Sequence, residues 1–245
     1  MTADTASPRS SPGRSIGRRL IGRLEARMTL LALLIAFCLS FMSPYFLTQS
    51  NIFNMLDQSV VIGIVAVGMT FVILTGGIDL SVGSVAGLTG IILGLALREM
   101  QIVPAIALAV AAGGFIGLVS GLLINVFGLA AFVVTLGVMA IGRSLAYILS
   151  GQTAISTIPD AMQSIVYTTV LGVPTNVIFL LALYLAAFLY LSYTKGGRTI
   201  YAVGSNKEAA RAAGLSVLFY AVLPYVISGA LSAVAITFSL SLIHI

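Results

Sequence analysis

Charged residues are scarce in this sequence. They make up 8% of its 245 residues, whereas hydrophobic residues make up 59%, and the mean hydropathy is +1.13. A water-soluble domain carries about 25% charged residues, so the composition excludes one and indicates an integral membrane protein. The apolar runs are long and do not alternate as barrel strands do. Helices are therefore the expected spans, because they satisfy their backbone hydrogen bonds internally.

Cysteine and histidine occur once each. Cys38 lies in the first apolar run, where a single thiol excludes an internal disulfide or Cys-x-x-Cys site and predicts a small buried apolar residue. His244 is next to the last residue and receives no catalytic or metal role. No G-x-x-x-x-G-K-[ST] stretch is present to cradle nucleotide phosphates, and no Ser/His/Asp, Cys/His or metal-ligand constellation supports chemistry. We therefore predict no catalytic residue, no metal and no cofactor on this chain.

Seven apolar runs are near the length of about 20 residues that a membrane helix needs. The fold class predicted is an all-α polytopic membrane bundle. Its spans are expected at about Met28 to Leu47, Gln58 to Leu74, Val82 to Leu97, Val103 to Phe127, Ala130 to Leu149, Thr175 to Tyr193 and Val217 to Leu242.

The net charge of +5 comes from basic residues that flank the spans, which indicates topology and not nucleic-acid binding. One cluster lies in residues 1–27, predicted to be a disordered cytoplasmic tail before a membrane domain over 28–245. The other lies in the loop 194–216. Six crossings separate the clusters, so the positive-inside rule places both, and the N-terminus, in the cytoplasm. The connection from Ser150 to Pro174 carries no basic residue and is expected outside.

Three sets of glycines recur at four-residue spacing, two of them in the run from Val82 to Leu97 and one in the run from Val103 to Phe127. The sets are Gly83 and Gly87; Gly90 and Gly94; and Gly113, Gly117 and Gly121. This spacing places each set on one helix face, where the backbones of neighbouring helices can approach closely. The pattern predicts a tightly packed bundle, which favours a transporter or channel over a simple anchor.

An acidic residue interrupts two apolar runs in the stretch GMTFVILTGGIDLSVGSVAG, residues 68–87. Gly76 and Gly77 can break the preceding helix, and Asp79 or Ser81 can accept hydrogen bonds from free N–H groups at the start of the next one. A carboxylate within the membrane is costly to bury, so a functional role is also expected for it. Two roles for Asp79 therefore stay open: helix breaking and capping, or gating, substrate contact and cation coupling. Gly83 and Ser84 complete this candidate site.

The cytoplasmic loop contains a second candidate site. Ser205 and Glu208 have the spacing of a capping box, and Gly214 offers a helix stop two turns later. The predicted short helix carries Lys207 and Arg211 on one face, with Ala209 and Ala210 between them. Two roles are open for this segment. It is a basic loop that faces water or lipid headgroups, or it is a helix that docks on another protein.

Two polar residues lie within predicted spans. Arg143 needs a partner, a water-filled cavity or access to the membrane interface, so it either orients neighbouring helices or contacts substrate. Asn125, at the end of its span, is expected to form an interhelical hydrogen bond.

The stretch NIFNMLDQSVVIGIVAVGMTFVILTGGIDLSVGSVAG, residues 51–87, closely resembles the signature region of the ribose/xylose/arabinose-type permeases of bacterial ABC importers. AAFVVTLGVMAIGRSLAYILSGQT, 130–153, and GRTIYAVGSNKEAARAAG, 197–214, resemble later segments of the same family. The loop segment E-A-A-x-x-x-G, 208–214, is similar to the coupling helix of ABC importer permeases. The resemblance covers about residues 51–230. It fades after about Ser239, and because family members continue for several more helices, we expect a C-terminally shortened version.

The resemblance implies a permease subunit for monosaccharides in the bacterial plasma (inner) membrane. Its implied partners are an ABC ATPase subunit that binds ATP and Mg, an external sugar-binding protein and a second permease subunit. Residues 76–84 would belong to the translocation path, and 205–214 would dock on the ATPase. Permeases for nucleosides or branched-chain amino acids share the broad architecture. A secondary transporter, in which Asp79 binds a proton or cation, is the rival from another class.

Overall fold

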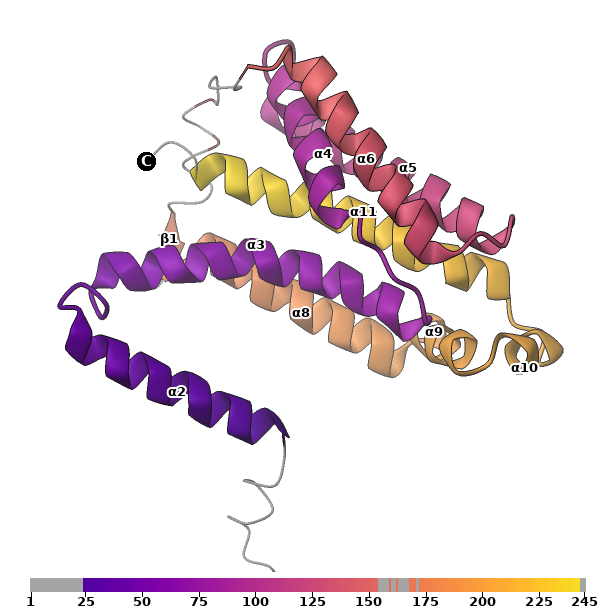
Figure 1. The fold of residues 1–245 in the computed structure, drawn as a ribbon, viewed down its shortest axis with the longest axis horizontal. Helices are drawn as coiled ribbons and strands as arrows, with labels where there is room; N and C mark the ends of the chain where they lie inside the picture. Colours follow the sequence, from indigo (N-terminus) through magenta and orange to yellow (C-terminus); the bar gives the residue numbers. More distant parts are fainter. Residues whose placement is uncertain (1–23, 154–158, 160–161, 163–167, 171, 243–245) are drawn as a thin grey trace, which may run out of the picture. The chain divides into compact units, whose positions relative to one another are not determined.

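The computed structural model describes residues 24–153, 159, 162, 168–170 and 172–242 (Figure 1). The chain divides into two compact units, residues 1–52 and 53–245. The predicted tail, 1–27, and His244 fall largely outside the described residues. The division into a tail and one membrane domain therefore stays a prediction.

The first unit contains helix α2, Leu24–Met42. It ends earlier than the expected Leu47, because Pro44 disfavours helical backbone in the residue before it. The turn that follows is closed by the Asn51 Nδ2–H, which donates to the Phe46 carbonyl at 2.8 Å. Cys38 is exposed on α2, so the prediction that it is buried is wrong. A thiol behaves as a small apolar group, which makes it compatible with a lipid-facing position.

Helices dominate the second unit. In chain order the elements are α3 (Gln49–Leu74, which begins in the first unit), α4 (Val82–Ala96), α5 (Ile102–Asn125), α6 (Ala131–Ser150), the strands β1 (Thr169–Val170) and β2 (Val173–Pro174), α8 (Thr175–Tyr193), α9 (Lys195–Ser205), α10 (Lys207–Ala212) and α11 (Val217–Leu242). The strands form an antiparallel pair in which Thr169 lies opposite Pro174.

Every predicted span corresponds to a helix, but not every helix is long enough to cross a membrane alone. Among the described residues, α3, α5, α6, α8 and α11 are long and apolar enough, whereas the apolar parts of α2 and α4 are shorter. The count by length is thus five and not seven. For α4 the reason is local: residues 75–81 form a non-helical turn before it and it ends at Ala96, which leaves a helix of 15 residues. Helix α3 begins nine residues before the predicted Gln58.

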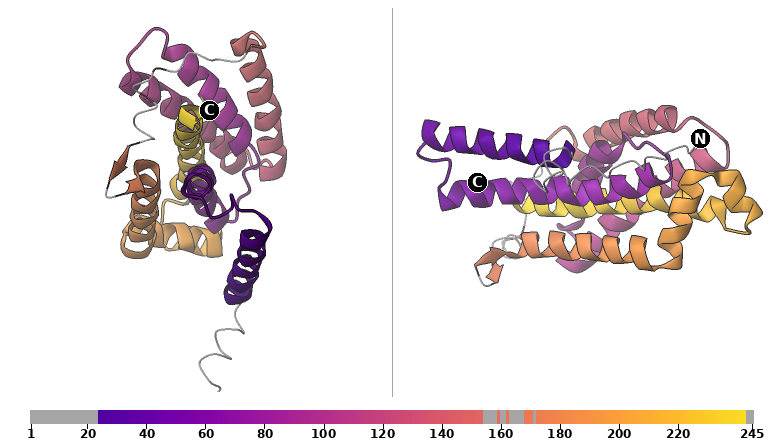
Figure 2. Two further views of the ribbon diagram at one scale, coloured as in Figure 1. Left: turned by 90° about the vertical axis from the view of Figure 1, so that its left-hand side faces the viewer. Right: turned by 90° about the horizontal axis from the view of Figure 1, so that it is seen from below.

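Helix α11 is the centre of the second unit. It runs between α3 and α8 on one side and α4, α5 and α6 on the other (Figures 1 and 2). On the first side, Val60 and Ile64 of α3 pack with Ala235 of α11 and with apolar side chains of α8. On the other side its backbone approaches α5 so closely that a Cβ at Gly117 would overlap the Tyr225 carbonyl.

The glycine pattern is only partly an internal packing signal. Gly113, Gly117 and Gly121 all face α11, as the spacing predicts. Gly83 and Gly87 do not: a Cβ added at either would meet nothing within 4 Å, and both residues are exposed. The prediction that they pack a neighbouring helix is therefore wrong within this chain. Their face of α4 remains open because α6 crosses α4 at Gly142, which lies against Ser84.

The α5–α11 contact yields a test with a matched control on the same helix. Gly117→Ala places a Cβ 2.7 Å from the Tyr225 carbonyl carbon, whereas Gly114→Ala places one 3.7 Å from the Val226 side chain. Overpacking against the backbone in Gly117→Ala is expected to lower the free energy of unfolding by about 1–3 kcal/mol. The ordinary contact in Gly114→Ala should change it by no more than about 0.5 kcal/mol. Thermal unfolding of the two variants in mild detergent measures the difference. Equal stability would contradict this packing of α5 on α11.

Candidate functional site

The carboxylate of Asp79 lies in a turn between α3 and α4 and is only 4% exposed. Its Oδ1 accepts hydrogen bonds from the backbone N–H of Ser81 at 3.0 Å and from the Ser81 hydroxyl at 2.6 Å. Its Oδ2 accepts the hydroxyl of Ser228 on α11 at 2.9 Å. All three donors are neutral, so the charge is stabilised by oriented dipoles at both oxygens. Ser228 also ties this turn to the central helix.

The sequence offered Asp79 and Ser81 as acceptors for N–H groups at the start of α4. Asp79 accepts the N–H of Ser81, the residue immediately before α4, and no N–H of the helix itself. The Ser81 hydroxyl donates to Asp79 and makes no capping bond. Ser84 also points back into the turn, because its hydroxyl donates to the Ser81 carbonyl at 2.8 Å. These bonds make residues 79–84 a closed local network.

Glycines let α3 stop sharply before Asp79. Gly76 has a φ of +74°, a conformation that favours glycine, and the Gly77 N–H donates to the Val72 carbonyl at 3.0 Å. Gly77 lies against the hydroxyl of Tyr225, which fills the space that a side chain would need. Tyr225 is 2% exposed, and its hydroxyl is the one buried side-chain polar atom of the described residues without a hydrogen-bond partner.

The loop 194–216 forms two short helices and not the single one predicted. Ser205 is the last residue of α9, so it cannot cap α10. Asn206 takes that place: its Oδ1 accepts the N–H groups of Glu208 and Ala209, each at 2.9 Å. The prediction of a Ser205–Glu208 capping box is therefore wrong by one residue, because Ser205 continues the preceding helix. Gly214 ends the segment with a φ of +76°, as its position predicted.

Helix α10 presents most of its side chains outward. Glu208, Ala209 and Arg211 are exposed, whereas Ala210 is 4% exposed and packs with Val203 of α9 and the start of α11. One buried position therefore anchors α10 on the bundle. The exposed charges of Glu208 and Arg211 are left for another surface.

Helix α9 contacts the end of α3 directly. A Cβ at Gly204 would overlap the Leu74 carbonyl and lie 3.2 Å from the Cα of Thr75. Leu74 is the last residue of α3, so this contact lies immediately before the glycines of the Asp79 turn. The loop helices and the start of the acidic turn, which are far apart in the sequence, are thus in direct contact.

A second link joins α10 to the bundle through Asn125 at the end of α5. Lys207 Nζ donates to Asn125 Oδ1 at 3.2 Å, and Asn125 Nδ2 donates to the Ala221 carbonyl of α11 at 3.3 Å. The predicted interhelical role of Asn125 is therefore confirmed. Arg143, in contrast, lies on an exposed face of α6, away from these links.

Sequence reasoning missed four residues that hold the turn and the bundle in place. Ser228 and Tyr225 are unremarkable in an apolar run, and nothing local pairs them with Asp79. Asp57 on α3 binds Asn176 of α8 through the Asn176 Nδ2–H, and Asn176 is fully buried. The presence of Asp57 in an apolar helix could have predicted a polar partner on a neighbouring helix.

The helices, the interrupted pair α3–α4 and the exposed loop helices define the class of protein: a multi-pass helical membrane protein with a polar turn inside the bundle. The family described as "branched-chain amino acid transport system / permease component" matches residues 51–243, and the chain belongs to this permease family. The match continues past Ser239, where the resemblance was expected to fade.

Individual relatives agree with this membership. The ribose import permease protein RbsC of Escherichia coli (strain K12) is 38% identical over 202 residues, which are 80% of this chain and 63% of the relative. The D-allose transport system permease protein AlsC of the same organism is 34% identical over 197 residues, 79% of this chain and 60% of the relative. RbsC of Bacillus subtilis (strain 168) is 34% identical over 209 residues, 84% and 65%.

The chain thus spans less than two thirds of the length of these relatives. No solved structure matches it.

The two α11 side chains at the turn should respond differently to loss of their hydroxyls. Ser228→Ala removes a donor from a buried carboxylate and is expected to destabilise the protein by about 1–3 kcal/mol. Tyr225→Phe removes a hydroxyl without a partner and should change stability by less than about 1 kcal/mol. Unfolding of both variants in lipid bicelles provides the comparison. A larger loss for Tyr225→Phe would contradict the hydrogen bonding described for the turn.

Proposed function

We propose that this chain acts as the membrane-spanning permease subunit of an ATP-driven importer of monosaccharides. In this proposal an external binding protein delivers the sugar, a second permease subunit completes the path, and a separate ATPase subunit binds ATP and Mg. The observation that carries the proposal is the pair α9–α10, in which an exposed charged helix is joined to the end of α3 beside the Asp79 turn. Such an arrangement suits a helix that receives force from another subunit and transmits it to the bundle.

Sugars are the favoured substrates among those that the family covers. The family description names branched-chain amino acids, but the relatives at 34–38% identity are named for ribose and allose. Similarity to them over about 80% of this chain supports a related substrate class here. Import of nucleosides or branched-chain amino acids is the alternative within the family.

A secondary transporter with a cation at Asp79 is less well supported. Both oxygens of Asp79 already accept hydrogen bonds from Ser81 and Ser228, and the carboxylate is 4% exposed. A cation would need to displace at least one of these donors. The geometry therefore favours a structural role for Asp79, as a helix breaker and a link to α11.

Orientation is part of the proposal. The chain would lie in the bacterial plasma (inner) membrane with its N-terminus in the cytoplasm, because α9 and α10 carry Lys195, Arg198, Lys207 and Arg211 between two spans. The Gly204–Leu74 contact is consistent with this topology, since the end of α3 and the loop helices then share the cytoplasmic side.

The exposed charges of α10 provide the test of ATPase docking. Glu208→Arg with Arg211→Glu preserves the net charge and leaves the buried Ala210 in place, so the helix should fold. We expect the doubly changed full-length protein, extracted in mild detergent, to lose its ATPase subunit in a pull-down identified by mass spectrometry. Lys195→Glu at the start of α9 is the charge-change control and should retain it. The proposal would be contradicted if the α10 variant retained the ATPase subunit, or if the wild type brought down no ATPase.

The contact of α9 with α3 makes a separate prediction about transmission. Gly204→Ala should keep the ATPase subunit bound, because α10 is unchanged, yet slow sugar uptake by about tenfold, as expected when close packing is lost at a moving joint. Ser205→Ala, one residue later and exposed, is the control and should transport normally. Unimpaired uptake by Gly204→Ala would show that force does not pass through this contact.

A further inference from the structure

An open groove lies between α4 and α6, beside the acidic turn. Its volume is 530 Å³, and its walls include Gly83, Gly87 and Ser84 of α4 and Arg143 and Tyr147 of α6. The two glycines are exposed and have no neighbour where a side chain would stand, so the floor of the groove is bare backbone. The opposite wall carries a guanidinium and a phenol.

Arg143 is the unusual member of this groove. It lies in the third turn from the end of α6, a span whose other residues carry no charge. In the described part of the chain it forms no hydrogen bond or ion pair, and it is exposed. Helical side chains lean toward the helix N-terminus, so the guanidinium is directed deeper along α6 and not toward its nearer end. An unpaired guanidinium at that depth cannot face hydrocarbon without a large cost.

A second copy of this chain would not neutralise Arg143 with a carboxylate from its described spans. Asp57 is hydrogen-bonded to Asn176, and Asp79 is buried with three donors of its own. Glu99 and Glu208 lie outside the membrane-spanning helices, and Glu25 precedes the apolar part of α2, which begins at Ala26. Water, or a ligand that accepts hydrogen bonds, is thus the environment that suits the guanidinium.

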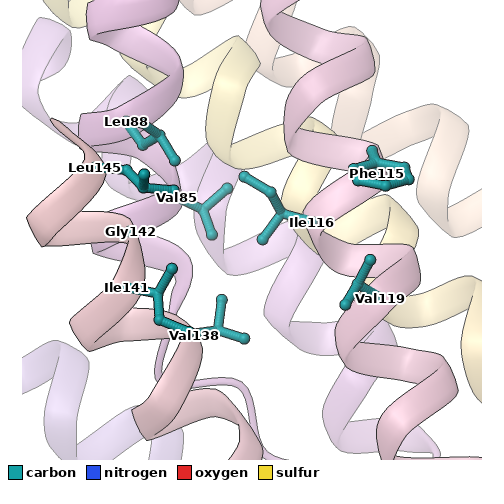
Figure 3. A pocket seen from close by; sticks show the side chains of 9 residues that line it. All are labelled: Val85, Leu88, Phe115, Ile116, Val119, Val138, Ile141, Gly142 and Leu145. Atoms are coloured by element: carbon teal, nitrogen blue, oxygen red, sulfur yellow. The ribbon is translucent and has the colours of Figure 1, made fainter. Parts of the chain in front are cut away.

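A neighbouring cavity shows the contrast. The pocket on the other side of Gly142, between α4, α5 and α6, has a volume of 210 Å³ and is lined by side chains such as Val85, Phe115 and Ile116 (Figure 3). Apart from Gly142, its lining consists of aliphatic and aromatic side chains, which offer no side-chain hydrogen-bond donor or acceptor to a ligand. Of these two spaces, only the groove at Arg143 can hold a polar molecule.

We propose that the α4/α6 groove is a water-filled segment of the substrate path in which Arg143 binds the hydroxyl groups of a sugar. A guanidinium presents five N–H donors in a planar fork, which fits adjacent hydroxyl oxygens. The phenol of Tyr147 adds an aromatic face and a hydroxyl, and the glycine floor lets the ring lie close to α4. This assignment rests on the proposed function and names the side chain that contacts its substrate.

Thiol accessibility tests whether the groove holds water. In a Cys38→Ser background, Gly87→Cys places a thiol in the groove, and Gly137→Cys places one outside it on α6. Both glycines are exposed, have nothing within 4 Å of an added Cβ, and lie in the second turn of their helices. The probe is a charged methanethiosulfonate reagent applied to open membrane fragments, which reacts with thiolates that form only in water.

We expect Gly87→Cys to react at least about tenfold faster than Gly137→Cys, because a thiolate forms far more readily in water than in hydrocarbon. Equal, slow reaction at both positions would show that lipid or protein fills the groove and would overturn the inference. This readout does not depend on an ATPase partner, so its failure is distinct from failure of the proposed function.

Substitution of Arg143 tests the ligand chemistry, with D-ribose and D-allose as the uptake probes in the full transporter. Arg143→Gln retains hydrogen-bond donors without charge and should keep much of the uptake. Arg143→Met removes every side-chain donor and should lower uptake about tenfold or more, as expected when hydrogen bonds to the sugar are lost. Pull-down of the ATPase shows that both variants assemble. Equal loss in both variants would identify an anionic ligand instead, and equal uptake, or a wild type that imports neither sugar, would overturn the sugar assignment.

Discussion

A buried carboxylate that must be satisfied inside an apolar bundle is the constraint on which this structure depends. Asp79 can remain within the membrane domain only because Ser81 and Ser228 supply donors to both of its oxygens. The first donors come from the turn itself and force it to close before α4 begins. The last comes from Ser228 of α11. The buried carboxylate therefore requires the turn and the central helix to keep their relative positions.

The rest of the second unit is organised around that registration. Close backbone contact at Gly117 sets α11 against α5, and Tyr225, one turn before Ser228, occupies the space beside Gly77. Helix α9 meets the other side of the turn through Gly204. In the proposed function, a displacement of the loop helices would reach the turn through this contact. This geometry supports the proposed role of α9 and α10 as the elements that another subunit would move.

Local signals in the sequence were sufficient for much of this architecture. Helices α8 and α11 begin and end at the predicted residues, because breaks in the apolar pattern coincide with turn residues such as Pro174 and Gly214. The start of α3 was missed because Asp57 lies where an apolar run was required, although its partner Asn176 makes it tolerable. The capping error at α10 arose because two good capping residues are adjacent, and only the extent of α9 decides between Ser205 and Asn206.

Other features depend on pairs that sequence spacing does not reveal. Asp79 and Ser228 are separated by 149 residues, and their hydrogen bond follows from how α11 packs. The open glycine face at Gly83 and Gly87 likewise depends on where α6 crosses α4. The same four-residue spacing describes a packed face on α5 and an exposed one on α4, so the pattern identifies a face without identifying what lies against it.

A double-mutant cycle between Asp79 and Ser228 tests the central constraint most directly. The free energies of unfolding of Asp79→Asn, Ser228→Ala and the double variant are measured in lipid bicelles, with Cys38→Ser as an unrelated reference change. Because the two side chains share a buried hydrogen bond, we predict a coupling energy of about 1 kcal/mol or more. Additive effects, within about 0.5 kcal/mol, would contradict the claim that the acidic turn is held by the central helix.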